Sequence, residues 1–121
     1  MLNIRQVVFL IAMVSIITFD VNAAEVNRTN LQIIKIASIA TNRPEAPSGT
    51  QGTIRIYVNS GSWGNTTCRA DAADIQMVDN HLLTIIMSAV AYGKTVDISV
   101  QSEIRPDGGE VCQATVVLIT I

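Results

Sequence analysis

The sequence predicts a small α+β domain in which one long helix, at about residues 79–92, lies between two pairs of strands of a small, mainly antiparallel sheet. Three observations predict this fold class. Thr53 to Asn59 and Thr95 to Gln101 both alternate apolar and polar residues, which is typical of half-buried strands. Asp79 to Lys94 instead repeats its apolar residues at helical spacing. A helix set between groups of strands favours an α+β architecture.

Residues 1–23 are typical of a cleaved signal peptide. Arg5 precedes an apolar run from Val7 to Ile17, and the small-residue pattern Val21-Asn22-Ala23 follows. The alternative is a membrane anchor, but the run spans about 11 to 13 residues where a spanning helix needs roughly 20. We therefore expect cleavage after Ala23, or one residue later, and a single secreted or periplasmic domain over residues 24–121.

Cys68 and Cys112 are the only cysteines. Export to an oxidising compartment predicts that they form a disulfide, and two free buried thiols are the alternative. The bond would close a loop of about 45 residues, for which the chain-entropy model gives roughly 3 to 4 kcal/mol of stabilisation. It would hold the segment before the helix against the start of the last strand.

The first part of the domain is predicted from composition and spacing. Residues 24–30 are polar, and we expect a loose terminus there. Leu31 to Ala40 is rich in isoleucine and predicts a mostly buried strand. Thr41 to Gly52 carries two prolines and two glycines, so it is predicted to be a loop before the strand at Thr53.

The helix has start and stop signals of its own. Asp79 or Asn80 is expected to cap the first amides, and Gly93 stands where helices commonly end in a left-handed turn. Asp71 and Asp74 indicate a shorter helical turn just before, or an earlier start to the same helix. The helix is apolar on more than its core stripe, so it is either buried on two sides or meets a neighbouring subunit.

The end of the chain reads as a hairpin. Arg105 to Glu110 is a Pro-Asp-Gly-Gly turn, and Val111 to Ile121 follows as a strand that is apolar on both faces. Paired with Thr95 to Gln101, this strand completes the predicted sheet.

Charge and residue types exclude several function classes. The net charge is −2 and no basic run exists, so we expect no nucleic-acid partner. With one histidine and with the cysteines joined, no zinc ligand set remains, and we expect neither metal nor cofactor.

No catalytic constellation is visible. His81 falls in the first turn of the helix, where a surface position is the simplest interpretation, and no base with an orienting partner accompanies it. Asp71, Asp74 and Asp79 are explained by the favourable helix dipole, with acid–base catalysis or calcium binding as alternatives. We therefore expect a protein that is not an enzyme.

The segment NSGSWGNTTC is the candidate ligand-binding region. It sets the only tryptophan among small polar residues, and an exposed indole face stacks on sugars or aromatic ligands while hydroxyl and amide groups bind beside it. The alternative is a structural Trp63 that folds over the end of the sheet and covers the disulfide. Arg69 is expected to pair with a carboxylate, Asp71 among them. The candidate ligand-binding residues are Ser60, Ser62, Trp63, Asn65 and Arg69.

The segments CRADAAD, HLLTIIMSAVAYGK and GKTVDISV resemble the receptor-binding B subunits of AB5-type toxins, the subtilase-cytotoxin B-like group in particular. In that group a cysteine precedes a long helix that ends in a Gly-Lys or Gly-Gln turn, and a V-x-I-x-V-like strand follows. The likeness covers roughly Trp63 to Ile121. It implies an OB-like open barrel, a secreted bacterial protein, assembly of copies through the helix, and sialylated-glycan binding. None of the family's sugar-contacting residues is matched position by position, and fewer strands precede the helix here.

Two function hypotheses follow, besides a less favoured small hydrolase. The first is a secreted, non-catalytic protein that binds a glycan or a cell-surface partner and can form a homo-oligomer through its helix. The second is a periplasmic inhibitor or an envelope structural protein in which Trp63 belongs to the core.

Overall fold

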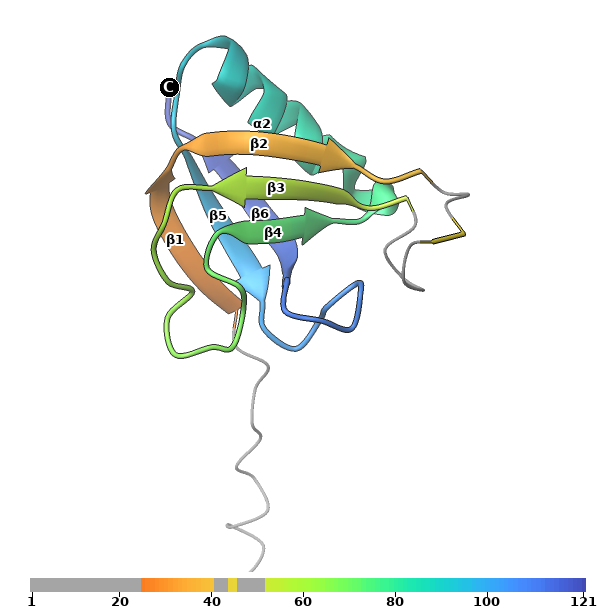
Figure 1. Cartoon of the computed structure of the whole chain (residues 1–121). Helices are drawn as coiled ribbons and strands as arrows, with labels where there is room; N and C mark the ends of the chain where they lie inside the picture. Colours follow the sequence, from red (N-terminus) through yellow and green to blue (C-terminus); the bar gives the residue numbers. More distant parts are fainter. Residues whose placement is uncertain (1–24, 41–43, 46–51) are drawn as a thin grey trace, which may run out of the picture.

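The computed structural model describes residues 25–40, 44–45 and 52–121 (Figure 1). The expected signal peptide lies outside the described residues, as does most of the loop predicted over residues 41–52. The elements in chain order are β1 (Glu25–Leu31), β2 (Ile33–Ser38), β3 (Ile54–Val58), β4 (Ala72–Ile75), the 3-10 helix η1 (Met77–Asp79), α2 (Asn80–Ala91), β5 (Val96–Gln101) and β6 (Gln113–Ile119).

All of these strands belong to one mixed sheet with the order β1-β5-β6-β4-β3-β2. Neighbouring strands run antiparallel except β4 and β6, which are parallel. The predicted α+β class, with a mainly antiparallel sheet and one helix between strands, is therefore confirmed. The predicted final hairpin is also confirmed, because β5 and β6 pair antiparallel over their whole length.

The sheet curls because a nearly continuous segment of chain supplies both of its edges. Only Gln32 separates β1 from β2, yet these strands lie at opposite ends of the sheet order (Figure 1). Counted as one bent strand, they give the five-strand pattern of an OB-like, partly open barrel. The barrel is not closed, because β1 and β2 do not pair with each other.

The bend between β1 and β2 is fixed by polar partners. Asn30 has a left-handed backbone with φ 57°, a conformation that asparagine tolerates better than most residues. Its N–H donates to Oδ1 of Asp97 over 3.0 Å. The N–H of Gln32 donates to Oδ1 of Asn59 over 2.9 Å, and the Gln32 carbonyl accepts from the Asn59 N–H over 3.2 Å. The backbone groups that leave the ladder at the bend are thus satisfied.

The expectation of a loose terminus before Leu31 is wrong. Residues from Glu25 onward form β1, whose backbone pairs with β5 along the edge of the sheet. Leu31 is buried, and Val26 packs against the core. Only these two side chains of the segment pack in the core, so it looks polar in sequence although residues Glu25 to Arg28 and Leu31 pair with β5.

The helical turn expected around Asp71 and Asp74 is also wrong. This stretch is β4, which lies between β3 and β6 and is buried along its whole length. Ala72 and Ala73 point to opposite faces of the sheet and both are fully buried, and the Asp74 carboxylate is neutralised by an arginine on β3. Four strands therefore precede the helix, instead of the two that the sequence pattern indicates.

α2 confirms the predicted helix and places its buried stripe, which consists of Leu82, Ile86 and Ala89, against the sheet. Gly93 ends it with φ 63°, as expected. Neither of the two predicted caps is observed, because the Asp79 side chain makes no capping hydrogen bond and Asn80 is already the first residue of the helix. Asp79 already belongs to η1, where its N–H donates to the Gln76 carbonyl, and its φ of −100° with ψ of 28° is not the extended conformation of a capping residue.

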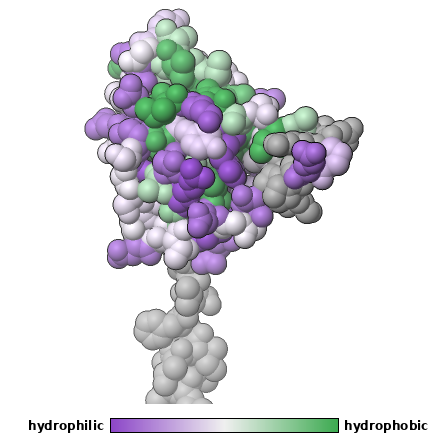
Figure 2. Space-filling model, viewed as in Figure 1, coloured by the Kyte–Doolittle hydropathy of each residue, from purple (hydrophilic) through white to green (hydrophobic). Residues whose placement is uncertain are grey.

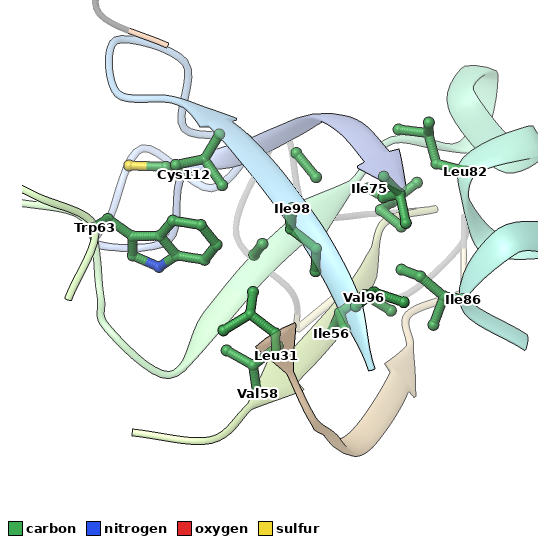
Figure 3. Close-up of a cluster of buried hydrophobic side chains, with 14 of the residues drawn as sticks. Leu31, Ile56, Val58, Trp63, Ile75, Leu82, Ile86, Val96, Ile98 and Cys112 are labelled. Atoms are coloured by element: carbon green, nitrogen blue, oxygen red, sulfur yellow. The ribbon is translucent and has the colours of Figure 1, made fainter. Parts of the chain in front are cut away.

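The core runs from the disulfide to the helix. Figure 3 shows Trp63 and Cys112 at one end and Leu82 and Ile86 at the other, with Ile98 between them. The predicted bond between Cys68 and Cys112 is present, joins residues 44 apart in sequence and brings their Cα atoms to 5.4 Å. It links the chain before β4 to the chain before β6.

Candidate functional site

The predicted ligand-binding segment is a compact turn. Thr66 Oγ1 donates to the Trp63 carbonyl over 2.7 Å and accepts from the Cys68 N–H over 3.3 Å. Ser62 Oγ donates to the carbonyl of Gly64, whose φ is 58°. These local bonds reverse the chain and direct the indole into the protein. Among the candidate residues, Ser60, Ser62, Asn65 and Arg69 remain exposed.

Trp63 itself is only 1 % exposed, so the expectation of an open indole face is wrong. It belongs to the same buried cluster as Cys68 and Cys112, which matches the alternative that the ring is core. A domain with few aromatic residues gains more from burying its largest ring than from exposing it. The indole Nε1 has no hydrogen-bond partner among the described residues.

Arg28 covers the indole. Its guanidinium lies 4.7 Å from the ring centroid, a cation–π contact, and donates to the carbonyls of Ala70 and Asn59. Gly61 allows this approach, because a Cβ at that position would stand 2.1 Å from the guanidinium. Burial lowers the pKa of Arg28 from its usual value. The sequence did not indicate this role, because Arg28 stands in the segment expected to be loose.

The exposed side of the turn borders a polar hollow of about 450 Å³. We call it the polar hollow; its lining residues are Asn65, Thr66, Thr67, Ser102, Glu103 and Arg105. Half of them come from the turn after Trp63 and half from the connection between β5 and β6. The disulfide lies behind both segments, since Cys68 follows the first and Cys112 ends the second.

Bonds between the two segments fix the frame of the hollow. The Arg105 guanidinium donates to Thr67 Oγ1 and, over 3.1 Å, to the carbonyl of Gly109. The Arg69 N–H donates to the Glu110 carbonyl over 2.6 Å. By contrast, the side chains of Asn65 and Glu103 make no hydrogen bond or ion pair with the described residues, so an amide and a carboxylate are free to meet a ligand.

The structure brings only part of the predicted set to this hollow. Asn65 lines it, whereas Ser60 and Ser62 do not. Arg69 turns to Asp71, as expected, with an Nε–Oδ1 distance of 2.6 Å. That contact raises the pKa of Arg69 and lowers the pKa of Asp71.

Sequence reasoning missed the half of the hollow that β5 and β6 supply, namely Ser102, Glu103 and Arg105. The predicted disulfide could have indicated these residues, because it places the segment just before Cys112 beside the segment just before Cys68.

A charged cluster lies on the outer face of β3 and β4. Arg55 donates from Nε and Nη2 to the two carboxylate oxygens of Asp74 over 2.8 and 2.9 Å, and from Nη2 to Asp107 over 3.1 Å. Asp74 is 1 % exposed. Burial raises the pKa of Asp74 and outweighs the opposing effect of Arg55.

The pKa values of the other two members of this cluster, Arg55 and Asp107, shift in the direction that favours their charged forms. Hydrogen bonding to Asp74 raises the pKa of Arg55. Burial acts to raise the pKa of Asp107, but the Gly109 N–H and Arg55 outweigh it, so that pKa is lowered. Because both oxygens of Asp74 bind Arg55, the cluster ties β3, β4 and the β5–β6 connection together and presents no free acid or base.

Three further observations concern His81, metal ligands and membrane spans in the described residues. His81 lies exposed at the start of α2. No group of three or more potential metal-ligating side chains occurs in the described part of the chain. Among these residues no helix has the length and apolar character needed to cross a membrane. Comparison with family models, curated protein sequences and solved structures gives no significant match to this chain.

Proposed function

We propose that this protein is a secreted, non-catalytic binding protein that takes a hydroxyl-rich ligand, such as a cell-surface glycan, in the polar hollow. One observation carries the proposal. The frame of the hollow is internally bonded through Arg105 and Thr67, while the Asn65 amide and the Glu103 carboxylate have no partner within the described residues. An amide and a carboxylate together offer the donors and acceptors that sugar hydroxyls need.

The fixed frame favours binding because a site that is already ordered loses little conformational freedom when a ligand arrives. The buried Trp63 and the disulfide support the same two segments from behind. The resemblance to AB5-type B subunits, an OB-like barrel that binds sialylated glycans, agrees with this function and remains part of the proposal.

A glycan-array screen of the exported protein tests the proposal. Glycans that bind should lose affinity with Asn65→Ala and with Glu103→Ala, by roughly threefold to tenfold each, because each variant removes the side-chain group that forms the hydrogen bond. Ser60→Ala is the matched control, since Ser60 is exposed on the same segment but does not line the hollow. Binding that survives both hollow variants, or that Ser60→Ala weakens equally, would contradict the assignment of the site.

A second candidate is a periplasmic inhibitor or an envelope structural protein. The buried Trp63 favours it, because that hypothesis requires the ring to be core. If this second function is correct, the folded protein should bind no glycan on the array. If the first function is correct, the array should give reproducible binding to particular glycans.

Self-association through α2 belongs to the first proposal. Met87 and Val90 are 50 % and 48 % exposed on this helix, which leaves apolar surface uncovered in one copy. Native mass measurement should give a multiple of the chain mass, and Met87→Glu should reduce it to that of one copy. A single-copy mass for the unchanged protein would contradict this part of the proposal.

Export is proposed on the strength of the leader pattern, and the disulfide is compatible with an oxidising destination. N-terminal sequencing of protein recovered outside the cytoplasm should begin at Ala24, or at Glu25 if cleavage falls one residue later. Recovery with the leader intact would contradict it.

A further inference from the structure

The polar hollow carries two opposite charges that do not pair with each other. Glu103 and Arg105 both line it, and no ion pair within the described residues includes either side chain. Figure 1 draws the β3–β4 and β5–β6 connections, which supply the lining, at the lower end of the molecule. In Figure 2 that end of the visible face is mostly hydrophilic to neutral, and hydrophobic residues gather in the upper part.

Arg105 is held in place by acceptors that carry no charge. Its guanidinium donates to the carbonyls of Ser102 and Gly109 over 3.4 and 3.1 Å, and to Thr67 Oγ1. A guanidinium has five N–H donors, so donors remain for a ligand after these three bonds. The frame therefore fixes the direction of the cation without neutralising it.

The acidic residues closest to Arg105 in the sequence leave its charge uncompensated. Asp107 instead accepts from Arg55 over 3.1 Å. Glu110 does not line the hollow and forms no ion pair within the described part of the chain. Glu103 is exposed and is likewise not bound to the guanidinium. The hollow thus presents a fixed cation and a free anion at separate positions.

Two separate opposite charges discriminate between classes of ligand. A ligand with a carboxylate alone is attracted by Arg105 and repelled by Glu103, and a ligand with an ammonium alone meets the reverse. A ligand that carries both groups satisfies both side chains. Asn65, on the opposite segment, adds a donor and an acceptor for a hydroxyl. The volume of about 450 Å³ is that of a small-molecule site.

We propose that the polar hollow selects a zwitterionic amino sugar, that is, a sugar unit with one free, protonated amine and one carboxylate. The ammonium lies at Glu103, the carboxylate at Arg105 and a ring hydroxyl at Asn65. This inference rests on the proposed function, because it names the class of glycan unit that the same site takes. The sialylated glycans implied by the resemblance to AB5-type B subunits carry an acylated nitrogen and therefore only the negative charge.

Four matched sugars test the two ligand charges one at a time, in ¹⁵N–¹H NMR titrations of the exported protein at mildly acidic pH. Muramic acid carries ring hydroxyls, an ammonium and a carboxylate. N-acetylmuramic acid lacks the ammonium, glucosamine lacks the carboxylate, and glucose lacks both. Muramic acid should bind about threefold to tenfold more tightly than either singly charged sugar, because each loses one charge-assisted contact. Amide shifts should centre on residues 65–67 and 102–105.

Variants remove the charges of the protein in the same way. Glu103→Gln keeps a hydrogen-bonding side chain, and it should abolish the preference for muramic acid over N-acetylmuramic acid. Arg105→Gln should abolish the preference over glucosamine, whereas Arg105→Lys, which also loses the frame bonds but keeps the charge, should retain a preference. Glu110→Gln is the matched control, because this exposed carboxylate lies on the same connection outside the hollow. Unchanged Trp63 fluorescence will show that each variant is folded.

The expected processed amino terminus is a competing cation. Glu25 is the register partner of Gln101, which directly precedes Ser102 of the hollow, so the terminal ammonium of a processed chain begins near this site. Acetylation of that amine should leave the affinity for muramic acid unchanged. Binding that appears only after acetylation would overturn the proposal, because Glu103 would then be the partner of the protein's own terminus.

Other results would overturn the charge selectivity without touching the proposed function. Equal binding of all four sugars in the hollow would show a site indifferent to charge. Tighter binding of N-acetylmuramic acid than of muramic acid would assign the hollow to anionic sugars. Equal binding of β-alanine, a zwitterion without a ring, would remove the sugar from the assignment, and muramic acid that fails to bind or shifts other amides would remove the site. The proposed function itself fails on a different result, namely glycan-array binding that Asn65→Ala and Glu103→Ala do not weaken.

Discussion

Trp63 is held by two different kinds of contact, and each can be removed separately. The core packs against one part of the indole, and the Arg28 guanidinium covers the ring at 4.7 Å while it donates to two backbone carbonyls. Since Trp63 is the only tryptophan, its fluorescence reports directly on this enclosure.

We expect Trp63 emission to be blue-shifted and almost insensitive to iodide in the folded protein, because the ring is shielded from solvent. Arg28→Ala should restore quenching and lower the free energy of unfolding by about 1 to 3 kcal/mol, since it removes the stacked cation and its carbonyl contacts. Arg28→Lys keeps the charge but not the forked set of donors. Its iodide quenching and its free energy of unfolding should therefore lie between those of the unchanged protein and those of Arg28→Ala. Strong quenching of the unchanged protein would show that the ring is not enclosed.

Arg55 holds a carboxylate that is almost completely buried. We expect Arg55→Met to lower the free energy of unfolding by about 3 to 5 kcal/mol at neutral pH, because it leaves Asp74 charged without a partner. Arg69→Met removes an exposed pair with Asp71 and should cost about 1 kcal/mol or less. Chemical denaturation of both variants measures the difference, and equal effects would contradict the special role of Arg55.

The pH dependence of Arg55→Met follows from the direction of the Asp74 pKa. Burial raises the folded-state pKa of Asp74, so the folded protein binds a proton more readily than the unfolded chain does. Without Arg55 that pKa rises further. The deficit of the variant should therefore shrink as the pH falls from neutral through the folded-state pKa of Asp74, because the neutral acid needs no cation. A deficit that grows on acidification would contradict this account.

At the scale of elements, the disulfide joins two segments that carry opposite sides of the polar hollow. The turn before Cys68 and the connection before Cys112 are also joined by the Arg105–Thr67 contact and by the bond from Arg69 to Glu110. The covalent and non-covalent links therefore act on the same pair of loops.

We expect the double variant Cys68→Ala/Cys112→Ala to lose about 3 to 4 kcal/mol of unfolding free energy, because its unfolded chain is no longer constrained over 44 residues. For a domain of this size that corresponds to a fall in melting temperature of roughly 10 to 30 °C. Calorimetry with and without a reducing agent measures it. Reductant should affect the unchanged protein but not the variant, and an equal response of both would contradict this explanation.

The fold as a whole depends on β1, although β1 has little sequence signature. This strand covers the edge of β5 and contributes Leu31 and Val26 to the core. Because it continues into β2 at the opposite edge, it also determines how far the sheet curls.

We expect a chain that begins at Ala24 to unfold cooperatively, since every strand is retained. A chain that begins at Gln32 should lose its cooperative transition, because the edge of β5 and the apolar side chains beneath it become exposed. Circular dichroism during thermal unfolding distinguishes them. A cooperative transition in the shorter chain would show that β1 is dispensable.

Local patterns were sufficient to predict the elements that have one wet and one dry face. β3, α2 and β5 each repeat apolar residues at their own period, and all three were predicted close to their observed bounds. β6, which is apolar on both faces in sequence, was predicted from the turn before it and from its pairing with β5. β4 was missed because it is buried on both faces, so it shows no alternation and its aspartate resembles a helix start. β1 was missed because its stability comes mainly from backbone pairing, and backbone pairing leaves little trace in the pattern of side chains.

The residues of the candidate site were also predicted only in part from the sequence. Asn65 was found from the small polar residues around Trp63, but Glu103 and Arg105 come from a segment about forty residues away and have no distinctive pattern of their own. The direction of the indole depended on a glycine at position 61 and an arginine at position 28. No spacing rule connects these residues, because they meet only after the sheet has formed.

By itself the sequence determined the α+β class, the helix with its glycine stop, the final hairpin and the pairing of the two cysteines, because each of these follows from periodicity or from residue type. Only the tertiary structure decided that β1 and β2 hold opposite edges of the sheet, that Trp63 is enclosed, and that Asp74 is neutralised within a strand. These features arise from contacts between residues distant in the chain, and their stability comes from burial and charge pairing that no local segment contains.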